Sequence, residues 1–192
     1  MAIESMTILW CVGGAVVASV VVVILLYNGL VTASQRVKNA WSQIDVQLKK
    51  RFDLVPNLVE IVKGYAKHEK EIFENVAKIR TSWAEATTVE GKIKASNMLA
   101  STLKSLFAVA ENYPALQANQ NFLALQQELS TIEEKVAYSR QFYNDMVMEY
   151  NTKIMQVPYN FIAGIFRFEP APYYEVEESE KEAIKKAPQV KF

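Results

Sequence analysis

The sequence predicts an all-α protein: an N-terminal transmembrane helix followed by an up-and-down four-helix bundle with long first and fourth helices. Three observations support this prediction. The chain opens with an apolar run free of charge, apolar residues then recur at helical spacing, and glycine and proline number only six each. Such long intervals between turn-forming residues suit helices better than a loop-rich β protein.

Residues 1–27 are predicted to form the transmembrane anchor. No charged side chain occurs from Ser5 to Ser34, and residues 8–26 are apolar or small almost throughout, close to the ~20 residues that cross a hydrocarbon core as a helix. The alternative is a signal peptide cleaved before Ser34. The anchor is favoured because no Lys or Arg precedes the run and because the run exceeds the usual apolar core of a signal peptide.

The charges on either side of the run predict its orientation. Only Glu4 precedes it, whereas Arg36, Lys38 and three basic residues at 49–51 follow it. The positive-inside rule therefore places the N-terminus outside the membrane and the rest of the chain in the cytoplasm. We expect a single-pass protein that contacts the lipid bilayer.

The first helix of the predicted bundle covers about residues 28–64. Its apolar seam alternates spacings of four and three residues, and Arg51 alone interrupts it. Because the phase of the seam does not change across Pro56, we interpret this proline as a kink inside one helix. The alternative is a break at Pro56, with Asn57 capping a new helix and Glu60 completing a capping box.

Three further helices complete the predicted bundle, which covers residues 28–157. Each helix is apolar on one side only, so the four should bury these sides together. Pro114 suits the first turn of the last helix. The second helix is expected over residues 66–86. The third is expected from a cap at Thr87 or Thr88 to about Glu111, and the fourth over residues 114–155.

Residues 158–192 are predicted to be a membrane-proximal apolar segment and a C-terminal tail. Aliphatic and aromatic residues dominate from Met155 to Phe168. This stretch is expected either at the bilayer surface or packed against the base of the bundle. Residues 169–192 have spaced prolines and then mixed charge, which is the composition of a disordered linker. The alternative is a tail that docks on another surface.

Composition and motifs argue against most chemical functions. The 21 basic and 21 acidic side chains balance, whereas a nucleic-acid-binding protein needs basic residues to neutralise phosphates, so no nucleic-acid partner is expected. Cys11 is the single cysteine and His68 the single histidine, so a zinc site is disfavoured and His68 is expected on a solvated helix surface. Adjacent carboxylates such as Glu133 and Glu134 point apart on a helix and are expected to be solvated. We predict no catalytic residue, no metal and no cofactor.

Two groups of polar residues near the seams are more informative. Burying the charge of Arg51 is costly unless a carboxylate pairs with it, and the expected partner is Asp45 or Glu128. We expect Arg51 to have a structural or interface role. A Tyr-Asn pair also occurs four times in the chain, and Tyr143 and Tyr150 lie on one stripe of a helix. The favoured interpretation is a core whose phenols and amides find partners within the bundle. The alternative is an exposed aromatic stripe that meets another copy.

Three long segments resemble the signature segments of the LemA family. They are AWSQIDVQLKKRFDLVPNLVEIVKGYAKHE, ENYPALQANQNFLALQQELSTIEEKVAYSRQFYNDMV and YNTKIMQVPYNFIA, and the resemblance runs from Tyr27 to the closing APQVKF. It implies a single-span protein of a bacterial inner membrane with a helical-bundle domain and no established enzymatic activity, catalytic residues or cofactor. Some relatives are linked to specialised membranes such as those of magnetosomes. The positions that match the family pattern are Trp41, Ile44, Asp45, Arg51, Asp53, Pro56, Asn57, His68, Glu69, Asn112, Tyr113, Pro114, Arg140, Tyr143 and Asn144.

Two functions from different classes follow. The first is a membrane-anchored structural or scaffold protein without catalytic activity that forms a homo-oligomer, in which contacts between copies bury Arg51 and the tail. The alternative is a signalling or adaptor module whose bundle binds a protein partner or ligand and transmits that binding through the kink at Pro56. The alternative predicts a pocket lined by a few converging polar groups.

Overall fold

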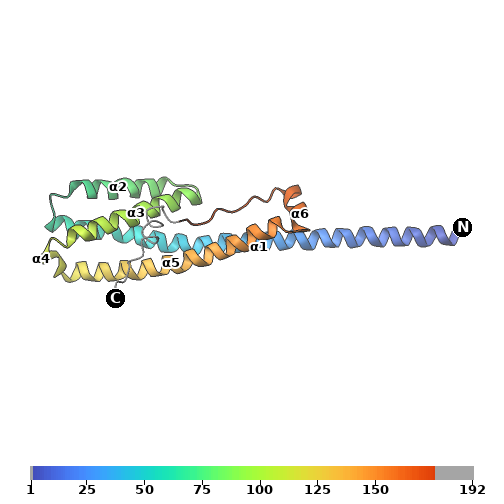
Figure 1. Cartoon of the computed structure of the whole chain (residues 1–192), viewed down its shortest axis with the longest axis horizontal. Coiled ribbons are helices and arrows are strands. Elements are labelled where there is room, and N and C mark those ends of the chain that lie inside the picture. Colours follow the sequence, from blue (N-terminus) through green and yellow to red (C-terminus); the bar gives the residue numbers. More distant parts are fainter. Residues whose placement is uncertain (1, 176–192) are drawn as a thin grey trace, which may run out of the picture. The chain divides into compact units, whose positions relative to one another are not determined.

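The computed structural model describes residues 2–175, and every regular element in that range is a helix (Figure 1). The predicted all-α class is therefore confirmed for the described residues. The helices are α1 (Ala2–Tyr65), α2 (Lys70–Glu85), α3 (Val89–Ala110), α4 (Pro114–Gln117), α5 (Gln120–Met155) and α6 (Tyr159–Phe166).

The chain divides into two compact units, which are described separately. Within the described residues, unit 1 contains residues 2–41 and 142–171, and unit 2 contains residues 42–141 and 172–175. Helices α1 and α5 each contribute residues to both units. The up-and-down four-helix arrangement over residues 28–157 stays a prediction.

Helix α1 continues through Pro56 without interruption, so the alternative of a break capped by Asn57 is wrong. The physical reason is the unchanged phase of the apolar seam, whose burial on both sides of the proline offsets the one backbone hydrogen bond that proline removes. A bend at this position stays a prediction. The buried seam residues are Val37, Ile44, Leu48, Arg51, Val55, Leu58 and Val62.

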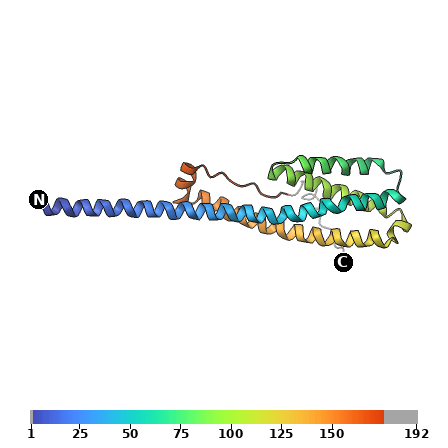
Figure 2. The ribbon, with the colours of Figure 1, turned by 180° about the vertical axis from the view of Figure 1, so that it is seen from behind.

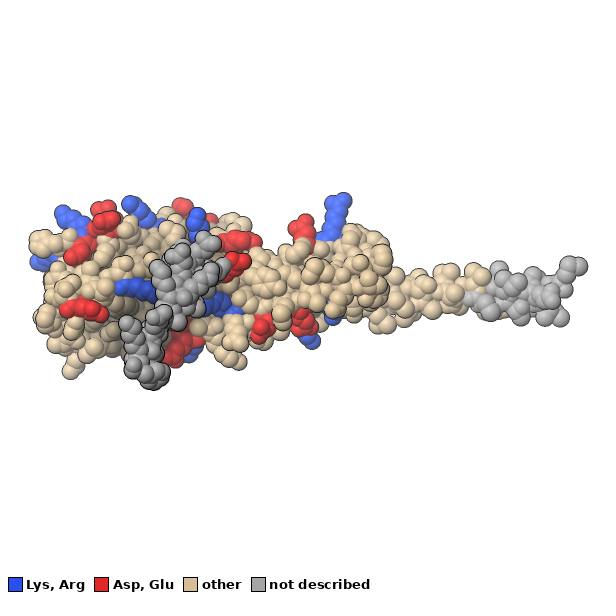
Figure 3. Space-filling model, in the orientation of Figure 1, with Lys and Arg blue, Asp and Glu red and all other residues tan. Residues whose placement is uncertain are grey.

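The first part of α1 is exposed and apolar. From Val12 onward the helix contains a stretch long and apolar enough to cross a membrane, judged by length and composition. The side chains from Val12 to Leu25 are exposed, and Figure 3 shows no coloured charge along this part of the helix. Water is a poor solvent for so long an apolar surface, which agrees with the predicted anchor.

In unit 1, α6 and the end of α5 pack beside α1 (Figures 1 and 2). The ring of Tyr27 lies 4.7 Å from that of Phe166 and 5.9 Å from that of Phe168, measured between centroids. A Cβ added to Gly29 would lie 3.2 Å from the ring of Tyr159, a tight contact that would require this ring to shift, so glycine suits this close approach. The predicted packing of this segment against the helices is therefore present. The buried side chains include Leu30, Ala33, Val147, Tyr150, Ile154, Ile162 and Ala163.

In unit 2, α2 lies alongside α3 in both views (Figures 1 and 2). The apolar sides of these helices meet residues of α1, α4 and α5 in one core, as their helical spacing predicts. Met98 on α3 is exposed. The most deeply buried core members include Val55, Leu58, Val62, Ala66, Leu99, Leu106 and Leu116.

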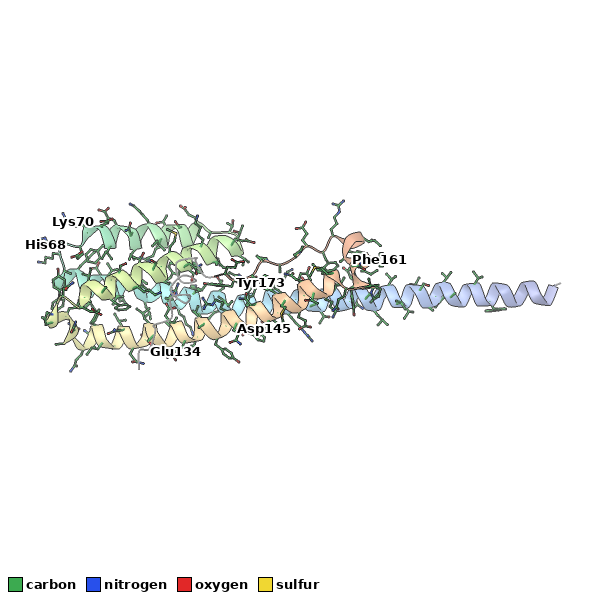
Figure 4. The ribbon with its side chains drawn as sticks, viewed as in Figure 1. His68, Lys70, Glu134, Asp145, Phe161 and Tyr173 are labelled. Atoms are coloured by element: carbon green, nitrogen blue, oxygen red, sulfur yellow. The ribbon has the colours of Figure 1, made fainter. Side chains whose placement is uncertain are left out.

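The turns in unit 2 follow local capping chemistry. The Oγ1 of Thr88 accepts a hydrogen bond from the N–H of Gly91 at 3.1 Å, so Thr88 is the cap of α3, as predicted. Helix α2 begins at Lys70 rather than at residue 66, because the chain forms a turn at residues 66–69. Ala66 is buried there, and its carbonyl accepts a hydrogen bond from the N–H of Glu69. His68 therefore lies in an exposed turn and not on a helix surface (Figure 4).

The predicted start of the last long helix at residue 114 was wrong. Pro114 opens only the four-residue α4, and the long helix α5 begins at Gln120. The Oδ1 of Asn119 accepts hydrogen bonds from the N–H groups of Asn121 at 2.9 Å and Phe122 at 3.1 Å. This side chain satisfies two donors that a helix start leaves free, and so begins a second helix.

The first residues of the predicted tail are docked rather than disordered. In unit 1 the hydroxyl of Tyr150 donates to the carbonyl of Glu169 at 2.9 Å, and the amide of Asn151 exchanges two 2.9 Å hydrogen bonds with the backbone of Ala171. In unit 2, Tyr174 is buried. The side chains of Tyr150 and Asn151 satisfy the extended backbone, which explains why this part is docked although its composition is that of a linker. The remaining tail, with APQVKF, lies outside the described residues.

The core of unit 2 generates a first prediction. Leu99→Ala should lower the free energy of unfolding by about 2–5 kcal/mol, because the fully buried side chain leaves a cavity among packed neighbours. The control Leu123→Ala, at a half-exposed position of α5, should change it by no more than about 0.5 kcal/mol. Denaturant unfolding of the detergent-solubilised chain, followed by circular dichroism, measures both values. Equal effects would contradict the described core.

Candidate functional site

Arg51 is the one charged residue buried within the described part of the chain, with 2% of its side chain exposed. It lies on the seam of α1 between Leu48 and Val55, where a helix of this spacing places apolar side chains in a core. A guanidinium in this position requires hydrogen-bonding partners, because an unpaired buried charge is strongly destabilising.

The guanidinium joins α1 to two other helices of unit 2. Its Nη1 donates to both carboxylate oxygens of Glu133 on α5, at 2.7 and 2.9 Å. Its Nη2 donates to the backbone carbonyl of Ser96 on α3 at 2.6 Å and to the Oγ of the same residue at 2.8 Å. Such charge-assisted contacts with a planar fork fix orientation as well as proximity.

The predicted partners of Arg51 were therefore wrong. Asp45 instead contacts Lys92, with 2.6 Å between carboxylate oxygen and Nζ. Glu128 is exposed and lies five residues before Glu133, about 7.5 Å along the axis of α5. Glu133 was expected on the solvated surface, and its side chain is 42% exposed while binding Arg51. The chain itself also buries Arg51, so contacts between copies are not needed for that purpose.

The hydrogen-bonded network continues into the C-terminal segment. The Oγ of Ser96 and the hydroxyl of Tyr174 are 2.9 Å apart, and either can donate. The guanidinium of Arg140 lies over the ring of Tyr174, 5.7 Å from its centroid. We call Arg51, Ser96, Glu133, Arg140 and Tyr174 the Arg51 cluster. It connects α1, α3, α5 and the extended segment before residue 176.

Burial raises the pKa of two tyrosines in these networks, whose phenols are already protonated at neutral pH. It raises the pKa of Tyr174, although the hydrogen bond from Ser96 and the nearby charges of Arg51 and Arg140 act in the opposite direction. The pKa of Tyr150 is also raised, by burial and by the carboxylate of Glu169. Both phenols are therefore neutral at physiological pH and act as hydrogen-bonding groups rather than as bases.

A second feature of unit 2 is a groove of about 720 Å³ bordered by α1, α2 and α3. The rings of Phe52 and Trp83 stack along it with 4.5 Å between centroids. The Nζ of Lys92 lies 5.2 Å from the centre of the Trp83 ring and also contacts Asp45. We call it the Trp83 groove. Its charged lining residues are Asp45, Lys49, Asp53, Arg80, Glu85 and Lys92.

The residues that match the family pattern do not form one site. The structure brings Arg51 and Arg140 into the Arg51 cluster, and Asp45 and Asp53 into the Trp83 groove. Other members of the pattern are dispersed over the units, some half-buried and others exposed. Ile44 is buried, Pro56, Glu69, Tyr113 and Asn144 are half-buried, and Asn57, His68, Asn112 and Pro114 are exposed.

Trp41 and Tyr143 meet in unit 1. Their rings lie 5.7 Å apart between centroids at 65°, an edge-to-face contact. Tyr143 and Tyr150 are both buried, which confirms the interpretation of a core stripe and contradicts that of an exposed stripe meeting another copy. Asn151 is buried as well, but its amide binds the backbone of the C-terminal segment rather than a partner across the bundle.

Sequence reasoning missed three members of the Arg51 cluster. Ser96 lies three residues from both Ile93 and Leu99 on the apolar side of α3, and a small polar residue there is a detectable signal of a buried partner. Glu133 lies four residues after Leu129 and three before Val136, a helical spacing that places it beside the apolar side of α5 and distinguishes it from Glu134. Tyr174 had no local signal, because its burial depends on a segment distant in sequence from α3.

Metal binding has no candidate in the described range. Among the described side chains, no group of three His, Cys, Asp or Glu residues is placed to hold a metal ion. His68 lies in its exposed turn near Lys70 (Figure 4). The Arg51 cluster can hold α1, α3 and α5 together, and the charged side chains that line the open Trp83 groove can contact a charged group.

Comparisons with known proteins place these features in a wider context. The family model described as LemA family matches residues 40–192, which include the Arg51 cluster and the Trp83 groove. Magnetosome protein MamQ 2 of Paramagnetospirillum magneticum is 27% identical, with 84% of this chain and 69% of that protein covered. Magnetosome protein MamQ of Magnetospirillum gryphiswaldense is 23% identical, with 83% and 68% covered. Protein LemA of Metamycoplasma hominis is 23% identical, with 71% and 63% covered.

The Arg51 cluster generates a second prediction. Glu133→Gln should lower the free energy of unfolding by about 2–3 kcal/mol, below the ~3–5 kcal/mol of a fully buried broken pair, because the carboxylate is 42% exposed. The double variant Arg51→Met/Glu133→Gln should be more stable than Glu133→Gln alone, since no uncompensated charge is left in the core. Chemical unfolding measures both, with exposed Glu134→Gln as control. A double variant less stable than the single one would contradict this account.

Proposed function

The chain belongs to the LemA family, and from this membership and its apolar first helix we propose that it is a membrane-anchored structural protein that associates with copies of itself and has no catalytic activity. The observation that carries the proposal is the dual use of α1. Its first part presents an exposed apolar surface, and its second part supplies the seam of the family-matched core. The name magnetosome protein, borne by relatives, supports a role in a cellular structure.

The orientation belongs to the same proposal. The N-terminus lies outside a bacterial inner membrane, and the helical part forms an up-and-down four-helix bundle in the cytoplasm. Arg36 and Lys38 follow the apolar run, and Lys153 and Arg167 lie in the same unit. Basic residues near the end of a span favour the cytoplasmic side, while acidic residues have little influence, so this unit supports the proposed orientation.

Self-association is supported by an exposed aromatic side chain on α5. Tyr138 in unit 2 is 76% exposed, and Tyr is among the residues that most often contribute binding energy at protein interfaces. The chain also carries no net charge, so copies do not repel one another strongly. We infer that the face of α5 around Tyr138 contacts another copy.

Imaging and mass measurement of the full chain extracted in native lipid particles test this proposal. We expect a uniform assembly of several copies. Tyr138→Glu should shift the particles to lower mass, because a carboxylate replaces an aromatic contact. Ser82→Glu, an exposed position of α2 that changes the charge by the same amount, should leave the mass unchanged. Monomeric particles of the unaltered chain would refute self-association.

The Trp83 groove favours a second candidate function, that of an adaptor. It has the converging polar groups that such a module requires, with three acidic and three basic side chains around a stacked aromatic pair. The partner is a protein segment of mixed charge. Mixed charge on the lining suits a mixed-charge segment better than a nucleic acid, which would meet the acidic side chains unfavourably.

A photo-crosslinking amino acid at two neighbouring positions separates the two functions. Ala84 lines the groove, whereas exposed Ser82 on the same helix does not. If the adaptor function holds, irradiated cells should yield one discrete adduct to a different protein from position 84 and none from position 82. An adduct only to the chain itself, identified by mass spectrometry, would contradict the adaptor function.

A further inference from the structure

Helix α6 is apolar over most of its surface, yet unit 1 covers only part of it. Its sequence is YNFIAGIF, in which Asn160 is the one non-aromatic polar residue. Ile162 and Ala163 are buried, whereas Phe161 is 65% and Ile165 71% exposed. A helix with no polar side is normally covered all round, so an outward side of this kind marks a surface that water does not solvate in the working state.

The exposed apolar surface extends into the turn before α6. Met155 and Val157 are largely exposed, and half of Phe166 is exposed at the other end of the helix. We call Met155, Val157, Phe161, Ile165 and Phe166 the α6 patch. Single exposed apolar residues are ordinary on protein surfaces, but five large ones within twelve consecutive positions are typical of an interaction surface.

The position of α6 within unit 1 indicates what covers the patch. The contacts of Tyr27 with Phe166 and of Gly29 with Tyr159 hold α6 beside residues 27–29 of α1. The unbroken run of exposed side chains on α1 ends just before this level, at Leu25, and burial begins at Leu30. The α6 patch is therefore continuous with the surface that the anchor presents to lipid.

The residues around α6 have the character of a membrane–water boundary. The Nζ of Lys153 lies 5.1 Å from the ring centre of Tyr159, and the exposed Arg167 ends the helix. Tyr27 closes the apolar run on α1. Aromatic rings and long basic side chains are enriched at this depth, where the rings meet the headgroups and the cations reach water or anionic lipid.

We propose that α6 is a second membrane contact, an interfacial helix that rests on the bilayer beside the anchor with Phe161 and Ile165 in the boundary between headgroups and acyl chains. This inference rests on the membrane anchoring in the proposed function, but not on self-association. A second copy is the competing occupant of the α6 patch. Lipid is favoured because the patch continues the lipid-facing surface of α1 and because its rim carries interfacial residues.

The single cysteine of the chain makes a direct test possible. In a Cys11→Ser background, the variants Phe161→Cys and Ile165→Cys each receive a nitroxide spin label at the new cysteine. The full-length labelled chain is then reconstituted in vesicles of phosphatidylethanolamine and phosphatidylglycerol. The relaxation effects of oxygen, which concentrates in lipid, and of a water-soluble nickel chelate report the surroundings of each label. Val17→Cys, in the exposed part of the anchor, is the lipid reference, and Lys78→Cys, on the exposed side of α2, is the aqueous reference.

We expect the labels at positions 161 and 165 to show a ratio of oxygen to nickel accessibility several-fold above that of K78C and close to that of V17C. All four positions are exposed, so labelling should leave the fold intact. A ratio equal to that of K78C would overturn the proposal. Low accessibility to both reagents would also overturn it, because it would place a second copy over the patch.

The reference position separates this proposal from the proposed function. If V17C itself were accessible to the nickel chelate, membrane anchoring would fail, and the inference about α6 would fall with it. If V17C reports lipid while the labels at 161 and 165 report water, only the inference about α6 fails. Self-association is measured independently by particle mass.

Discussion

A single buried guanidinium constrains how the elements of unit 2 meet. Arg51 occupies a seam position where an aliphatic side chain would pack without any directional requirement. Because its charge cannot be left unpaired in a core, α5 must bring Glu133 and α3 must bring Ser96 to defined positions around it. A slip of one helical turn in either element would remove these contacts, since residues four apart are about 6 Å apart along a helix.

This requirement also explains the docking of the C-terminal segment. The hydroxyl of Ser96 accepts from Arg51 and meets Tyr174, so the phenol completes a chain of hydrogen bonds that begins at Glu133. The cluster remains imperfect as a stabilising device, because the Nε of Arg51 is buried without a partner among the described residues. Specifying the arrangement of the helices, rather than maximising stability, is the physical role that suits such a group.

The surfaces left outside the two cores differ in chemistry, and each suits a different kind of partner. The first part of α1 and the α6 patch are apolar and belong to unit 1, where lipid is the proposed neighbour. The Trp83 groove is charged with both signs and belongs to unit 2. Tyr138 on α5 offers an aromatic contact for another copy. The proposed anchoring, self-association and partner binding therefore involve different residues.

The sequence by itself determined the helical class, the apolar first part of α1, the seam of α1 through Pro56 and a cap of α3 at Thr87 or Thr88, because these depend on local spacing and local hydrogen bonds. It also placed Arg51 in the core, since the seam leaves no other side for it. Only the tertiary structure decided that Glu133 is its partner, that Asn119 starts α5 and that Tyr174 docks. Several carboxylates lie near the apolar sides of the helices, and choosing among them requires the three-dimensional path of α3, α5 and the C-terminal segment, which local periodicity does not encode.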